Sequence, residues 1–159
     1  MKKLLLALLL PLMLIAGYSL MQKSKTQNAP VNKAVLNHIA LYVTNLSRST
    51  AFYHDIIGLD TIPEPFHDGK HTWFSISRQS QLHLIEGATE PVKHPKNTHL
   101  CFSVKSVESF IPVLDKAGIV YSNWPGTSKS PTVRADGIKQ IYFQDPDGYW
   151  IEINDDYRE

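Results

Sequence analysis

The heptapeptide NHIALYV at residues 37–43 decides the fold, because a related heptapeptide, THLCFSV, follows at residues 98–104. In both, apolar side chains occupy alternate positions, a pattern typical of a strand with one buried face. Each is followed by a polar capping residue, a stretch with helical periodicity and a glycine, at residues 45–58 and 106–118. The chain therefore contains an internal repeat, and each copy begins with a strand and a helix.

The later part of each copy also repeats, at a different spacing. Trp73 corresponds to Tyr142, and His83 corresponds to Glu152, whereas the first strands are offset by eight residues less. The extra residues fall in the stretch 125–131, which is rich in Gly, Ser and Pro and is predicted to be a loop. Each copy is therefore predicted to be a β-α-β-β-β module. Such a module is too small to bury both faces of its sheet, so two modules must pair, within the chain or between chains.

Four polar residues occupy repeat-related positions on these strands, namely His38, His83, His99 and Glu152. Because successive side chains of a strand point to opposite faces, each of the four points away from its apolar neighbours. If the helices cover the apolar faces, the four side chains converge in a cup. Three imidazoles and one carboxylate suit a divalent metal ion such as Zn, Ni, Fe or Mn rather than Ca.

The sequence resembles the vicinal oxygen chelate superfamily, which groups glyoxalase, bleomycin-resistance and extradiol-dioxygenase proteins, over about residues 35–155. The residues that carry the resemblance are NHIAL at 37–41, Phe52-Tyr53 leading to Gly58-Leu59, His99, and FQDPDGYWIE at 143–152. The resemblance implies an α+β fold over residues 35–159, with two βαβββ modules forming a curved mixed sheet around a metal-binding cup. It places His38, His99 and Glu152 on the three commonest metal-ligand positions of the family. His83 falls on the fourth, which is a glutamate in typical glyoxalase I enzymes.

The resemblance implies a metal-dependent, glyoxalase-like lyase or isomerase that acts on a small substrate held by two adjacent oxygens. Because His83 replaces a carboxylate, Glu152 is the only carboxylate of the four residues and the candidate catalytic base. Three alternatives stay open: a ligand-sequestering protein of the bleomycin-resistance type, which needs no metal, a thiol transferase like the fosfomycin-resistance enzymes, and a dioxygenase. His83 argues against the dioxygenase, since it would occupy a position that oxygen or substrate needs.

Further residues are candidates for substrate binding. Tyr42 lies two residues from His38 on the same strand face, and Trp73 and Tyr142 hold equivalent repeat positions from which they would flank an organic substrate. Arg134, in the loop of the second module, is expected to reach an anionic group of the substrate.

The N-terminus has the pattern of a targeting segment. Lys2 and Lys3 precede an apolar run, which predicts a signal peptide or membrane anchor at residues 1–25, followed by a polar linker at 26–34. We therefore expect a bacterial protein that is exported to the periplasm or anchored to the inner membrane.

Charge and cysteine content exclude two other classes. The net charge of +1 becomes −3 without the four lysines of residues 1–25, and the remaining basic residues are scattered, which disfavours a nucleic-acid surface. The single Cys101 cannot form an internal disulfide. The partners expected are a small-molecule substrate and a second copy of the chain in a homodimer.

Overall fold

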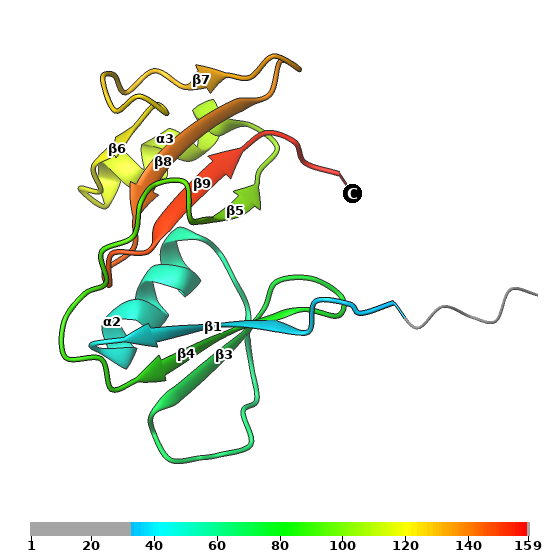
Figure 1. Ribbon diagram of the computed structural model, residues 1–159, viewed down its shortest axis with the longest axis vertical. Coiled ribbons are helices and arrows are strands. Elements are labelled where there is room, and N and C mark those ends of the chain that lie inside the picture. Colours follow the sequence, from blue (N-terminus) through cyan, green and yellow to red (C-terminus); the bar gives the residue numbers. More distant parts are fainter. Residues whose placement is uncertain (1–32, 159) are drawn as a thin grey trace, which may run out of the picture. The chain divides into compact units, whose positions relative to one another are not determined.

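Each predicted module folds around its own sheet in the computed structural model, which describes residues 33–158. In the first module a mixed sheet has the strand order β1-β4-β3-β2, with β1 and β4 parallel and the other neighbours antiparallel (Figure 1). Its elements are β1 (His38–Val43), α2 (Leu46–Ala51), a π-helical turn η1 (Phe52–Ile56), β2 (Thr61–Ile62), β3 (His71–Ser75) and β4 (Gln81–Glu86).

The second module repeats this plan with one addition. Its sheet has the order β5-β9-β8-β6, with β5 and β9 parallel, and a short extra strand, β7, pairs with β8. Its elements are β5 (His99–Ser103), α3 (Val107–Lys116), β6 (Tyr121–Ser122), β7 (Thr132–Val133), β8 (Lys139–Gln144) and β9 (Trp150–Asn154). The predicted α+β class and the two βαβββ modules are confirmed. Strand β7 was not predicted, and it follows directly on the loop that makes this module longer.

The strand registers confirm the repeat residue by residue. Trp73 lies opposite His83 on neighbouring strands, and Tyr142 lies opposite Glu152 in the same way. Each sheet therefore has one face on which an aromatic residue lies opposite a candidate metal ligand on the neighbouring strand.

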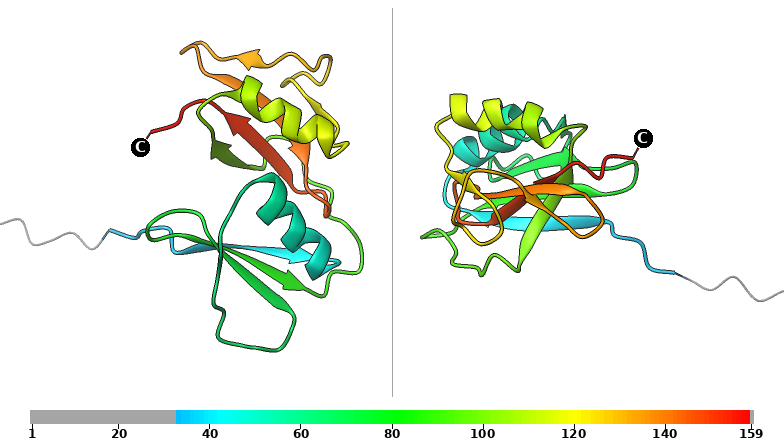
Figure 2. Two further views of the ribbon diagram at one scale, coloured as in Figure 1. Left: turned by 180° about the vertical axis from the view of Figure 1, so that it is seen from behind. Right: turned by 90° about the horizontal axis from the view of Figure 1, so that it is seen from above.

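The apolar faces of both sheets contribute to one hydrophobic core. Each helix lies across a face of its own sheet, α2 over β4 and β3, and α3 over β8 (Figure 2). Phe52 of the first module packs near Phe143 of the second, with ring centroids 6.3 Å apart. The fully buried core residues come from both modules and include Val43, Tyr53, Phe74, Leu84, Leu114, Ile141, Phe143, Ile151 and Ile153. The predicted single curved sheet is therefore two curved sheets that share a core on their helix-covered sides.

The predicted helix boundaries are confirmed by their caps. The Asn45 side chain accepts a 2.8 Å hydrogen bond from the Arg48 amide, and Gly58 after the helix has a positive φ of 83°. The first helix changes to a π-helical turn at Phe52, which the periodicity did not predict. Both Phe52 and Tyr53 are buried at this wider turn.

The predicted signal or anchor segment and most of the linker lie outside the described residues. Within residues 33–158, no helix combines the length and the apolar character that a membrane span requires.

Candidate metal centre

His99 on β5 and Glu152 on β9 form the first part of the candidate site. His99 Nε2 lies 3.1 Å from Glu152 Oε2, and the glutamate is only 6% exposed. His99 Nδ1 lies 2.7 Å from the Lys96 carbonyl oxygen, and because a carbonyl only accepts, Nδ1 is the nitrogen that carries a hydrogen. When the imidazole is neutral, its Nε2 lone pair therefore faces a carboxylate oxygen. A divalent cation bound between the two would stabilise this arrangement.

Three neighbouring side chains hold the Glu152 carboxylate in place. The Tyr142 hydroxyl donates to Oε2 at 2.8 Å, while the Asn154 amide and the Cys101 thiol contact Oε1 at 3.0 and 3.4 Å. Burial, together with the charge of Glu152, raises the pKa of Cys101 to about 12, so the thiol stays protonated near neutral pH. Burial and the hydrogen bond to Glu152 also raise the pKa of Tyr142.

His38 and His83 form the matching pair on the first sheet. Their rings stack with centroids 4.3 Å apart, and the other face of the His83 ring stacks on Trp73 at 3.9 Å. Burial lowers the pKa of His83, and the nearby His38 and His71 lower it further. His83 is therefore held in the neutral form, which is the form that binds metal ions.

The four predicted ligands do not gather into one cluster within a chain. Among residues 33–158, no group of three or more His, Cys, Asp or Glu side chains is close enough to hold a metal ion. The physical reason is the shared core: each sheet presents its helix-covered face to that core, and each pair lies on the opposite face of its own sheet. Within one chain the four residues therefore form two half-sites, the first made of His38 and His83, the second of His99 and Glu152. The assignment of all four as ligands stays a prediction.

The predicted substrate-binding residues are divided between the half-sites. Trp73 belongs to the first half-site and Tyr142 to the second, through the contacts given above. Tyr42 is 52% exposed on the sheet face of His38. The guanidinium of Arg134 forms an ion pair of 2.5 Å with Asp136 on the protein surface, so a substrate would have to compete with this carboxylate. Their contacts with a substrate stay predictions.

Two residues next to the second half-site, Gln140 and Lys96, were not predicted from the sequence. Gln140 is 7% exposed, and its Nε2 donates to the Tyr142 hydroxyl, while its Oε1 has no hydrogen-bond partner among the described residues. Strand alternation placed Gln140 on the face of Tyr142 and would have been enough to find it. Lys96 lies in a loop, where no periodicity indicates which way a side chain points.

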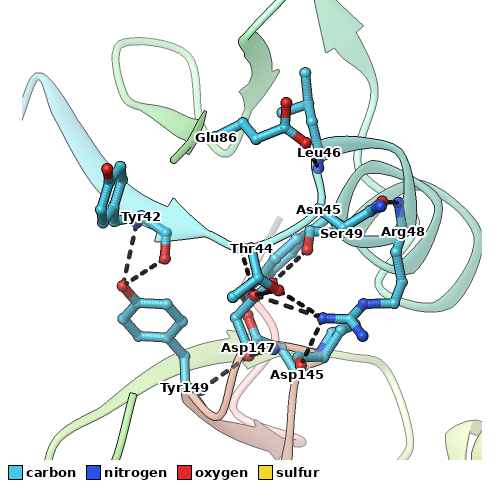
Figure 3. A network of polar contacts seen from close by, with 12 residues as sticks. Tyr42, Thr44, Asn45, Leu46, Arg48, Ser49, Glu86, Asp145, Asp147 and Tyr149 are labelled. Carbon is cyan, nitrogen blue, oxygen red and sulfur yellow. Dashed lines mark hydrogen bonds and ion pairs between the residues drawn. The ribbon is translucent and has the colours of Figure 1, made fainter. Parts of the chain in front are cut away.

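The Asp-Pro-Asp-Gly turn at residues 145–148 joins the two modules (Figure 3). The fully buried Asp147 carboxylate accepts hydrogen bonds from the Thr44 amide and hydroxyl, both at 2.7 Å, and from the Ser49 hydroxyl at 2.5 Å. Gly148 has a φ of +88°, and a Cβ there would lie 2.3 Å from the Val92 carbonyl oxygen. Through these contacts the turn fixes the first module to the second.

Comparisons with known proteins identify the family of this chain. The family described as the Glyoxalase/Bleomycin resistance protein/Dioxygenase superfamily matches residues 35–153. "Glyoxylase I 4" of Arabidopsis thaliana is 29% identical over 78% of this chain and 72% of its own length. "Glutathione transferase FosA" of Serratia marcescens is 28% identical over 75% of this chain and 79% of its own.

A solved structure is similar over nearly its whole length. A glyoxalase/dioxygenase from Nostoc punctiforme has a TM-score of 0.65 and 26% identity, and the similarity covers 82% of this chain and 96% of that one. Since the family match extends over most of the chain and through both modules, the protein belongs to the glyoxalase, bleomycin-resistance and dioxygenase superfamily.

Proposed function

We propose that this protein is a metal-dependent, glyoxalase-like lyase or isomerase whose small substrate offers two adjacent oxygens. The observation that carries the proposal is the 3.1 Å approach of His99 Nε2 to Glu152 Oε2. The Lys96 carbonyl orients the imidazole and the Tyr142 hydroxyl orients the carboxylate, and outer hydrogen bonds of this kind commonly support metal ligands. A protein that only sequesters a ligand needs neither of these contacts.

Two copies of the chain would complete the site. Each half-site supplies only two ligands, and the two half-sites lie on different modules of one chain. In a homodimer with two-fold symmetry, the first half-site of one copy faces the second half-site of the other, and the arrangement occurs twice. The donor set of three imidazole nitrogens and one carboxylate then suits Zn, Ni, Fe or Mn.

The residues of the chain divide the chemical work. A divalent metal held by His38, His83, His99 and Glu152 would supply a Lewis acid that lowers the pKa of a substrate hydroxyl. Glu152 takes a proton from a substrate carbon at one of its carboxylate oxygens and returns it to the neighbouring carbon. Tyr142 keeps the carboxylate oriented, while the rings of Trp73 and Tyr142 flank the substrate and exclude water.

Thiol transfer is the second candidate, and one observation favours it. With His83 in the fourth position, the half-sites contain a single carboxylate, whereas proton shuttling is better supported by two. Addition of a thiol to an electrophile held by a metal needs no such shuttle. Two relatives with 28% and 27% identity are named as a glutathione transferase and a metallothiol transferase.

Metal analysis of the purified protein, followed by two assays, tests the proposal. The wild type is expected to contain about one divalent metal ion per chain, and His99→Ala to lose it. His54→Ala, which changes an exposed histidine outside both half-sites, is the matched control and is expected to keep the metal. Isomerisation of a hemithioacetal and addition of a thiol to an epoxide are then compared in wild type and Glu152→Gln. A metal-free wild type, or equal activity in Glu152→Gln, would refute the proposal.

A further inference from the structure

The ammonium group of Lys96 is held next to the second half-site without a carboxylate partner. Its Nζ lies 3.1 Å from the Trp124 carbonyl oxygen, 3.3 Å from that of Asn123 and 3.4 Å from the Ser122 hydroxyl. It also lies over the Trp150 and Tyr142 rings, 4.8 and 5.4 Å from their centroids. Within residues 33–158, all of these neighbours are neutral.

Three other basic side chains of the second module are paired with carboxylates. Arg134 binds Asp136 at 2.5 Å, Lys129 binds Asp115 at 3.2 Å, and Lys139 binds Glu108 at 2.5 Å. Lys96 differs from these three because its charge is partly buried and faces only dipoles and rings. An ammonium in such a setting attracts an anion more strongly than a surface lysine does, since less water screens its charge.

The position of Lys96 links it to the candidate metal centre. Its own carbonyl oxygen accepts the hydrogen bond that orients His99. The Tyr142 ring near its ammonium carries the hydroxyl that donates to Glu152. A cavity of about 430 Å³ is lined in part by Ser122, Tyr142 and Trp150, which contact or underlie the Lys96 ammonium, and also by Asp145. Lys96 itself lies next to this lining and is not part of it. A cavity of this size accepts a small organic molecule.

We propose that Lys96 binds the anionic group of the substrate, so that the substrate class is a small organic anion with adjacent oxygens, such as an α-hydroxy acid. This inference rests on the proposed function for the reacting end of the substrate. It assigns the charge recognition to Lys96 rather than to Arg134, because the guanidinium of Arg134 is paired with a carboxylate whereas the three acceptors of the Lys96 ammonium are neutral. A substrate anion would replace one of these neutral acceptors. The rings of Trp150 and Tyr142 hold the Lys96 ammonium through cation–π contacts.

A purely structural role for Lys96 makes a different prediction. In that case its ammonium only ties its loop to residues 122–124, and its removal weakens the binding of charged and neutral ligands alike. Anion recognition instead affects charged ligands only. A pair of probes that differ in charge but share a shape therefore separates the two roles.

Lactate and lactamide are such a pair, because both carry adjacent oxygens and only lactate is charged. Binding to the full-length, metal-loaded protein is followed by NMR through the indole N–H signal of Trp150, which donates to the His94 carbonyl oxygen at 3.0 Å. We expect Lys96→Met to weaken lactate binding about tenfold or more, and to change lactamide binding by less than about twofold. Lys96→Arg, which keeps the charge, is expected to retain most of the lactate affinity.

Lys129→Met is the matched control. Lys129 also lies over an aromatic ring, 4.8 Å from the Tyr121 centroid, but it is paired with Asp115. This variant is expected to bind both probes as the wild type does. Unchanged lactate binding in Lys96→Met, or an equal loss for lactate and lactamide, would overturn the inference.

The metal content of each variant is measured in parallel. It shows whether a negative result contradicts the role of Lys96 or the proposed function. Metal-loaded Lys96→Met with wild-type lactate affinity contradicts only the role of Lys96. A wild type that binds no metal contradicts the proposed function. In that case a loss of lactate binding in Lys96→Met still supports the anion site.

Discussion

Tyr142 and Glu152 face each other across strands β8 and β9, and the tyrosine hydroxyl donates a 2.8 Å hydrogen bond to Glu152 Oε2. The repeat places Trp73 opposite His83 in the first module in the same way, and there the contact is a ring stack of 3.9 Å. In both modules an aromatic side chain on one strand thus orients a candidate metal ligand on the next. The two half-sites share a plan and differ in the interaction that holds the ligand.

Replacing Tyr142 with Phe tests this orienting role. The variant keeps the ring but removes the donor to Glu152 and the acceptor that Gln140 Nε2 uses. We expect metal affinity to fall about 10- to 100-fold, because outer groups that orient metal ligands have effects of this size. Competition with a chromogenic chelator measures the affinity, and Tyr157→Phe, at an exposed tyrosine, serves as control. Wild-type affinity in Tyr142→Phe would show that the carboxylate is oriented without the hydroxyl.

Among the residues that join the two modules, we expect substitution of the buried Asp147 to lower the stability most. Asp147→Ala removes the acceptor for the Thr44 amide, the Thr44 hydroxyl and the Ser49 hydroxyl, and leaves one buried and two part-buried donors without this partner. The free energy of unfolding should fall by about 3 kcal/mol or more, as measured by urea denaturation.

The control for this prediction is Asp136→Ala, which removes an exposed carboxylate paired with Arg134. It should change the stability by less than about 1 kcal/mol. Similar losses in both variants would mean that the network at Asp147 contributes no more than an ordinary surface ion pair.

Asp145 gives the stability a specific pH dependence. Burial raises its pKa from 3.8 to about 6, although the hydrogen bond from Tyr53 opposes the shift. The Asp145 carboxyl group is therefore protonated below about pH 6 in the folded protein, but only below about pH 4 in the unfolded chain. Ionisation of Asp145 thus lowers the stability as the pH rises from about 4 to 6, by at most about 3 kcal/mol.

Urea denaturation of wild type and Asp145→Asn at several pH values isolates this contribution from other carboxyl groups. The stability of the wild type relative to the variant should fall between about pH 4 and pH 6 and then level off. A constant difference across this range would show that the pKa of Asp145 is not raised in the folded protein.

The N-terminal segment makes a prediction about location. Because the apolar run at residues 4–16 follows two lysines, we expect export from the bacterial cytoplasm or retention at the inner membrane. Cell fractionation, combined with mass determination of the N-terminus, measures both outcomes. Native protein found in the cytoplasm, with residues 1–25 intact and no membrane association, would contradict it.

The sequence predicted the modules well because their signals are local. Alternation over residues 37–43 and 98–104, the capping Asn45 and the glycine at 58 each act within a few residues, and the structure confirms the strands and helices that they indicate. Alternation also predicted correctly that His83 and Glu152 lie on the faces away from the core.

The relation between the modules depends on contacts that no local pattern encodes. Asp147 reaches Thr44 and Ser49 from about a hundred residues away, and Phe52 meets Phe143 in a shared core. These contacts put the half-sites on opposite sides of that core. Alternation alone could not distinguish a cup within one chain from a cup between two chains. Lys96 was missed for a related reason, because its contacts are with another loop.

Subunit complementation tests the central claim, that one metal ion is held by two half-sites from different copies. One variant carries His38→Ala with His83→Ala, the other His99→Ala with Glu152→Gln, and each alone is expected to bind no metal tightly. When equal amounts are unfolded and refolded together, half of the dimers combine the two variants, and each of these has one complete site. We predict that the mixture binds about a quarter of the metal per chain that the wild type binds. No metal in the mixture, with wild-type protein treated in the same way regaining its own, would contradict a site shared between two copies.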